Sequence, residues 1–131
     1  MTVTASLLRD PRTRRARIAV LWLAVAFTLV MATLPKPPQL PGAPTDKVQH
    51  IAAFLVLTIL AVVAYPQAPR WRVLLWLAGF GGAIELVQAI PALHRSSDWR
   101  DWLADIGAVL VALALAALAR KISPGPPQPA D

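Results

Sequence analysis

The sequence predicts an all-α protein, and more narrowly a four-helix integral membrane bundle with both termini in the cytoplasm. Three observations lead to this prediction. Hydrophobic residues make up 56% of the 131 residues and charged residues only 15%, which is too apolar for an ordinary soluble domain of this size. The apolar residues come in four long runs rather than in stripes. The basic residues gather at the ends of those runs, as they do beside membrane spans.

Each apolar run is close to the roughly 17–25 residues that a membrane-spanning helix needs. Pro35, Pro66 and Pro91 follow the first three runs. Proline is a credible helix stop because it lacks a backbone donor and clashes with the preceding turn. Tryptophan and tyrosine lie near the run ends, where amphipathic rings favour the headgroup layer. The expected spans are residues 18–34, 48–65, 71–90 and 102–119.

The first run also fits a cleaved signal peptide, because it follows an arginine-rich segment and ends near the small residue Ala32. Its apolar stretch is longer than the core of about 7–15 residues typical of signal peptides, which favours a retained anchor. For the other runs the alternative is buried core helices of a soluble protein. The scarcity of polar residues between the runs argues against it.

Orientation follows from the distribution of lysine and arginine. Nine lie on the side of the N-terminal segment, the 67–72 turn and the tail, and four lie on the other side. This predicts a basic cytoplasmic head at 1–17, a four-helix transmembrane domain at 18–120 and a disordered proline-rich tail at 121–131. The loops 35–47 and 91–101 then face outward, the first of them stiffened by prolines.

The net charge of +6 does not predict nucleic-acid binding. The basic residues flank apolar runs and form neither a basic helical face nor an aromatic–basic platform. The chain has no cysteine, so the sequence supports neither a disulfide framework nor thiolate chemistry.

Polar and ionisable residues gather at the outer ends of the last three runs. An ionisable side chain at mid-bilayer costs about 2.5–3.5 kcal/mol on insertion scales, so such residues must be paired, hydrated or in use. Helical spacing places Asp46 with His50, Glu85 with Gln88, and Asp101 with Asp105 on shared faces and at similar depths, while Arg95 and Asp98 sit in the loop above. The cluster comprises Asp46, Lys47, His50, Glu85, Gln88, Arg95, Asp98, Asp101 and Asp105.

This cluster predicts a site for an anionic headgroup or a lipid-linked phosphate. Carboxylates beside an imidazole are able to position a water or hydroxyl and to move a proton, and the candidate catalytic residues are His50, Glu85, Asp101 and Asp105. An arginine grips phosphate or carboxylate through its planar fork, and the candidate ligand-binding residues are Asp46, Lys47, Gln88, Arg95 and Asp98. A divalent cation is compatible with these oxygen ligands, but no fixed metal spacing is present and the metal stays unknown.

Plainer roles compete with these. Asp46 is placed to cap the second helix. In a second interpretation the cluster is an ion-paired lid, with Lys47, Arg95 and Arg100 neutralising the carboxylates. A buried ion pair is weak evidence for stability, because desolvation offsets the Coulomb attraction. No serine or threonine is flanked like an activated nucleophile.

The order and spacing of these residues resemble the VanZ-like family of small membrane proteins. The likeness covers residues 46–107 and rests on Asp46-Lys47-x-x-His50 with Phe54, on Glu85-x-x-Gln88, on Arg95 and Asp98, and on Asp101-x-x-x-Asp105 with Gly107. It implies a multi-pass protein of the bacterial or archaeal inner (plasma) membrane, near cell-wall precursors or the outer leaflet. The family is named after a member linked to teicoplanin resistance and has no firmly assigned reaction, so antibiotic resistance is not transferred to this chain.

Two departures from the family pattern concern the loop and the last helix. Leu93-His94 precede Arg95 where many members have Pro-Gly, which puts the loop geometry in doubt. Gly107 is followed by Val111 where many members repeat the glycine, which puts close helix packing in doubt.

Three functions remain in competition. The first is binding or processing of a lipid-linked or anionic envelope molecule. The second is a non-catalytic subunit or homo-oligomer that docks a membrane partner through the glycines at 79, 81 and 82, since small residues allow close helix approach. The third is a proton or ion path, and it is disfavoured because residues 59–64 and 110–118 offer no polar relay.

Overall fold

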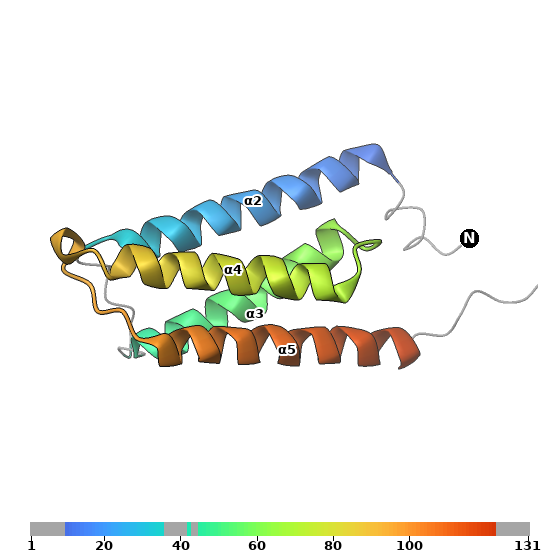
Figure 1. The fold of residues 1–131 in the computed structure, drawn as a ribbon. Helices are drawn as coiled ribbons and strands as arrows, with labels where there is room; N and C mark the ends of the chain where they lie inside the picture. Colours follow the sequence, from blue (N-terminus) through green and yellow to red (C-terminus); the bar gives the residue numbers. More distant parts are fainter. Residues whose placement is uncertain (1–9, 36–41, 43–44, 123–131) are drawn as a thin grey trace, which may run out of the picture.

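The computed structural model describes residues 10–35, 42 and 45–122. Within these residues the chain forms four α-helices and a single 3-10 turn, so the all-α prediction is confirmed. Successive helices run in opposite directions and lie alongside one another (Figure 1). They are α2 (Pro11–Thr33), α3 (Asp46–Ala64), α4 (Arg70–Gln88) and α5 (Trp99–Ile122), with the turn η1 (Pro91–Leu93) before α5.

Three of the four predicted spans are long and apolar enough to cross a membrane: α2, α3 and α5. α4 is not among them, although the sequence predicted a span there. It carries Arg70, Arg72 and Glu85 within 19 residues, and these charges lower its hydropathy. The structure therefore supports three candidate spans by length and composition, with α4 as a more polar companion that is as long as α3.

The first helix begins at Pro11, earlier than the predicted start at residue 18. Asp10 caps it, because its Oδ1 accepts the Arg12 backbone N–H at 3.0 Å. Pro11 stands at the first helical position, where its missing N–H costs nothing. Residues 11–17 of the predicted basic head are therefore helical and continuous with the first span.

The other boundaries shift by one to three residues. Thr45, and not the predicted Asp46, caps α3, with its Oγ1 accepting the Val48 N–H at 3.4 Å. α4 ends at Gln88 and Pro91 opens η1, while α5 extends beyond the predicted run at both ends. The predicted stiff loop at 35–47 and the predicted disordered tail at 121–131 lie mostly outside the described residues.

The core lies between α3, α4 and α5. Its most enclosed apolar side chains are Phe54, Leu57, Leu77, Ile84 and Val109. α2 buries few of its own, and most of its large apolar side chains are exposed. An apolar surface of this extent is what lipid would cover.

The glycines of α4 have different surroundings. A Cβ added to Gly81 would lie 3.2 Å from Phe54 Cζ and 3.3 Å from both Asp105 Oδ2 and Trp102 Cδ1. One added to Gly79 would meet nothing within 4 Å. Only Gly81 therefore marks a close approach to α3 and α5, and Gly79 faces outward.

Candidate functional site

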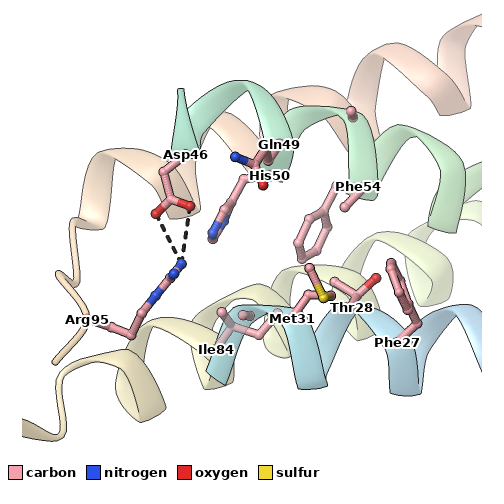
Figure 2. Close-up of a pocket in the computed structure, with 12 residues that line it drawn as sticks. Phe27, Thr28, Met31, Asp46, Gln49, His50, Phe54, Ile84 and Arg95 are labelled. Carbon is pink, nitrogen blue, oxygen red and sulfur yellow. Dashed lines mark hydrogen bonds and ion pairs between the residues drawn. The ribbon is translucent and has the colours of Figure 1, made fainter. Parts of the chain in front are cut away.

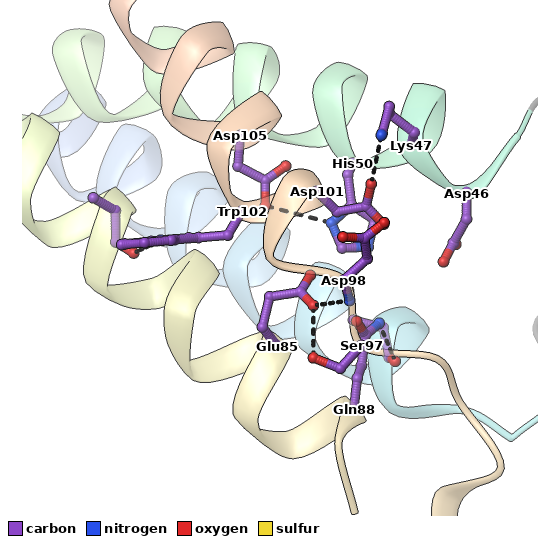
Figure 3. A network of polar contacts seen from close by, with 12 residues as sticks. Asp46, Lys47, His50, Glu85, Gln88, Ser97, Asp98, Asp101, Trp102 and Asp105 are labelled. Carbon is purple, nitrogen blue, oxygen red and sulfur yellow. Dashed lines mark hydrogen bonds and ion pairs between the residues drawn. The ribbon is translucent and has the colours of Figure 1, made fainter.

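The residues of the predicted polar cluster all lie at one end of the molecule. The end of α4 and the starts of α3 and α5 meet there, beside the loop that holds η1 (Figures 1 and 3). The cluster is divided into separate contacts, however, and only part of it faces a cavity.

The deepest contact joins α3 to α5. His50 Nδ1 lies 3.4 Å from Asp105 Oδ2, and the two side chains are 8% and 1% exposed. Asp105 Oδ1 is buried and has no hydrogen-bond partner among the described residues. Because Gly81 on α4 has no Cβ, the Asp105 carboxylate is able to lie close to that helix. With Nδ1 engaged by Asp105, Nε2 is the ring nitrogen left to other partners.

Glu85 holds the loop that leads into α5 (Figure 3). Its Oε2 accepts the Asp98 backbone N–H at 2.9 Å and the Ser97 hydroxyl at 3.0 Å. The residue is buried, and its Oε1 has no partner within the part of the chain that is described. Ser97 was not among the predicted residues, because nothing in the sequence marks which loop hydroxyl reaches α4.

Gln88 and Asp98 form hydrogen bonds at the ends of helices. Gln88 Nε2 donates to the Ala32 carbonyl at 3.0 Å and so ties the end of α2 to α4. Asp98 Oδ1 accepts the Arg100 backbone N–H at 2.9 Å, which makes Asp98 the cap of α5. Both were predicted as ligand-binding residues, and in this structure both have internal partners.

Lys47 and Asp101 form an ion pair at the rim. Lys47 Nζ lies 3.2 Å from Asp101 Oδ1, with the lysine side chain 44% exposed. This pair links the starts of α3 and α5 on the outer side of the His50–Asp105 contact (Figure 3). The Asp101 side chain is 14% exposed, and an ion pair with one partner in water contributes about 0–1 kcal/mol.

The last contact borders a cavity. Arg95 Nη2 lies 3.2 Å from Asp46 Oδ1 and 3.4 Å from Oδ2. The arginine side chain is 9% exposed and the aspartate 43%. The cavity beside them has a volume of about 290 Å³ (Figure 2). It is lined by Phe27, Thr28, Met31, Ala32, Asp46, Gln49, His50, Ala52, Ala53, Phe54, Ile84 and Arg95.

We call this cavity the α2–α3 cleft, because nearly all its lining comes from those two helices. Three predicted residues line it: Asp46, His50 and Arg95. The other six predicted residues do not. The lining from α2 was not foreseen, because an apolar helix gives no sequence signal that distinguishes a cavity wall from a lipid-facing surface.

No group of three or more metal-ligating side chains is suited to hold an ion among the described residues. The carboxylates of the cluster point to separate partners on the loop, α3 and α5. The arrangement therefore offers hydrogen-bonding and ion-pairing groups more readily than a coordination shell.

No family model matches the chain, and neither a curated protein nor a solved structure matches it. The fold and the site consequently rest on the residues themselves, and the VanZ-like resemblance stays a prediction.

Proposed function

We propose that the chain is a multi-pass membrane protein of the VanZ-like kind, with both termini in the cytoplasm, that binds an anionic or lipid-linked envelope molecule. The observation that carries this proposal is the shape of the α2–α3 cleft. Its walls are mostly apolar, and a polar group formed by Asp46, His50 and Arg95 stands at the end of the helices. A molecule with an apolar chain and a charged headgroup matches both parts.

Arg95 is the natural contact for an anionic headgroup. One of its nitrogens serves both oxygens of Asp46, which leaves further N–H donors of the guanidinium for a ligand. Asp46 is far more exposed than Arg95, so it is able to turn toward water when ligand oxygens approach. A phosphate or carboxylate would replace it with two parallel hydrogen bonds.

His50 adds a proton acceptor at the same cleft. Asp105 fixes one side of the imidazole from within the core, and the ring borders the cavity. A carboxylate that orients an imidazole is an arrangement found in general-base catalysis. The proposal thus extends from binding to processing of the bound molecule, with His50 in contact with it and Asp105 as a positioning residue.

The distribution of charge supports the proposed orientation. The starts of α2 and α4 and the end of α5 share the end opposite the polar cluster (Figure 1). The described basic residues at that end are Arg12, Arg14, Arg15, Arg17, Arg70, Arg72, Arg120 and Lys121. Lysine and arginine accumulate on the cytoplasmic side of membrane proteins, and this rule favours a cleft that faces the outer leaflet.

Cysteine labelling tests this orientation directly, because the chain has no cysteine of its own. Ser96→Cys lies in the loop of the polar end and Gln67→Cys lies in the α3–α4 turn, both at exposed positions. A membrane-impermeant maleimide applied to intact cells should label only the first variant. Labelling of Gln67→Cys alone would show the reverse orientation.

Binding is tested on the purified full chain in detergent, with polyprenyl phosphate as the probe and native mass spectrometry as the readout. The polyprenyl alcohol and inorganic phosphate are the matched comparisons. We expect the phosphorylated chain to bind, and Arg95→Gln to weaken it about 10–100-fold, which is the size of a lost charge-assisted hydrogen bond. Arg100→Gln is the control, since this exposed arginine lies at the same end and does not line the cleft.

Equal binding of the alcohol and the phosphate would refute an anionic site. Wild-type binding by Arg95→Gln would refute the assigned contact. A signal from inorganic phosphate alone would show that the apolar walls contribute nothing to recognition.

The alternative is a non-catalytic subunit whose polar cluster is an ion-paired lid. The three ion pairs and the Glu85 contacts favour it, because they join α3, α4, α5 and the loop without any ligand. Docking would use the outward Gly79 face of α4, since a side chain at Gly82 would meet Trp102. Gly79→Leu should then break a co-purifying complex, while Arg95→Gln should leave it intact.

A further inference from the structure

A second cleft lies at the basic end of the molecule, between α2, the end of α3 and the start of α4. Its volume is about 300 Å³. That is about twice the size of a cavity known to hold a benzene ring, so a segment of hydrocarbon chain fits it. Its lining is mostly apolar and aromatic, and consists of Leu21, Trp22, Ala61, Tyr65, Ala68, Arg72, Val73 and Trp76.

Aromatic rings with polar tips form the sides of this basic-end cleft. Trp22 packs edge-on against Trp76 with ring centroids 5.6 Å apart, and its Nε1 donates to the Tyr65 hydroxyl at 3.4 Å. All three residues are between 37% and 49% exposed. Half-exposed tryptophan and tyrosine near helix ends are typical of the level where lipid headgroups meet acyl chains.

Arg72 is the one charged residue among those that line this cleft. Its guanidinium lies 5.2 Å from the Trp71 ring centroid and forms no ion pair with any carboxylate of residues 10–35, 42 and 45–122. Of the described acidic residues, only Asp10 belongs to this end of the helices. The cleft therefore presents hydrocarbon-sized space beside an arginine in a strongly positive region.

We propose that this basic-end cleft binds an anionic phospholipid of the surrounding leaflet, with one acyl chain between Trp22 and Trp76 and the phosphate on Arg72. The charge around the cleft selects an anionic lipid over a zwitterionic one, because basic residues near a membrane surface attract anionic headgroups. The site is separate from the α2–α3 cleft and does not depend on the function proposed for it.

The test uses the full chain in phosphatidylcholine nanodiscs that contain a minority of phosphatidylglycerol with brominated acyl chains. Bromine quenches tryptophan emission at short range. Brominated phosphatidylcholine at the same fraction gives the baseline, and the excess quenching by phosphatidylglycerol measures selective occupancy. We expect a clear excess for the wild type. It should be reduced in Trp22→Phe, where Trp76 still lines the cleft and reports quenching, and kept in Trp99→Phe at the opposite end.

Arg72→Gln should lower the preference for phosphatidylglycerol about fivefold, the usual effect of one basic residue near a charged surface. Arg14→Gln is the matched control, because this exposed arginine lies at the same end but does not line the cleft. Ala68→Leu fills the cleft without changing charge and should also remove the excess, which keeps the test decisive if Arg72→Gln folds poorly.

Three results would overturn the proposal. Equal quenching by the two lipids would show that the cleft does not select an anionic headgroup. A loss in Arg14→Gln as large as in Arg72→Gln would show diffuse attraction to the whole basic end. Unchanged quenching in Ala68→Leu would show that no acyl chain enters the cleft.

Discussion

Replacement of Gly81 by alanine tests how tightly the helices close around the His50–Asp105 pair. The new Cβ would lie 3.2 Å from Phe54 and 3.3 Å from Asp105. These two residues are 1% and 0% exposed, so both are enclosed by neighbouring side chains. Overpacking of this kind costs about 1–3 kcal/mol.

The size of the effect is best measured against Gly79→Ala on the same helix. Each substitution gains about 1 kcal/mol of helix propensity, so this term cancels in the comparison. A Cβ at Gly79 meets nothing within 4 Å, and one at Gly82 meets Trp102 at an ordinary 3.5 Å. We therefore expect Gly81→Ala to be about 1–3 kcal/mol less stable than Gly79→Ala, with Gly82→Ala near Gly79→Ala.

The assay is unfolding of the purified protein in mixed detergent micelles, followed by far-ultraviolet circular dichroism. All three variants carry the same added methyl group, so differences among them report packing alone. Gly81→Ala as stable as Gly79→Ala would refute the close approach of α3, α4 and α5, and with it the enclosed position of Asp105.

Two further predictions concern the polar end. Glu85→Ala should destabilise the protein by about 1–3 kcal/mol, because the Asp98 N–H loses its acceptor, and hydrogen exchange should rise at residues 94–98. Ser97→Ala removes only one of the two hydrogen bonds to Glu85 and should destabilise the protein less. Equal destabilisation by the two variants would contradict the assigned geometry. A double-mutant cycle of Lys47→Met and Asp101→Asn should give a coupling energy below about 1 kcal/mol, because Lys47 is 44% exposed. A larger coupling in the unfolding assay would show that the pair is shielded from water.

The helices were predictable because apolar runs and prolines leave a strong one-dimensional signal. The start of α2 was missed for a physical reason. Arginine is a good helix former, so a drop in hydropathy at residue 17 does not end a helix. The true boundary signal was the Asp10-Pro11 pair, which supplies both a capping side chain and a residue suited to the first turn.

The depth of the polar residues along the helices was also predictable, but their hydrogen-bond and ion-pair partners were not. Helix rise places His50, Glu85 and Asp105 at similar depths, and the structure has all three at one end. Which side chain meets which depends on how each helix is rotated and on the path of the 89–98 loop. Residue spacing gives no information on helix rotation or on the path of the loop, so the contact between Glu85 and the loop backbone could not be predicted.

The polar cluster is divided into separate contacts, and this division affects both candidate functions. A side chain with strong internal partners must lose them before it can bind a ligand, and the lost hydrogen bonds oppose binding. Glu85 and Gln88 are in that position, since both are buried and engaged. Arg95 and His50 are different, because each has one internal partner and also borders the α2–α3 cleft. Recognition of a ligand should therefore depend on Arg95 and His50, while Glu85 and Gln88 govern stability, and a variant series that reversed this order would favour the ion-paired lid.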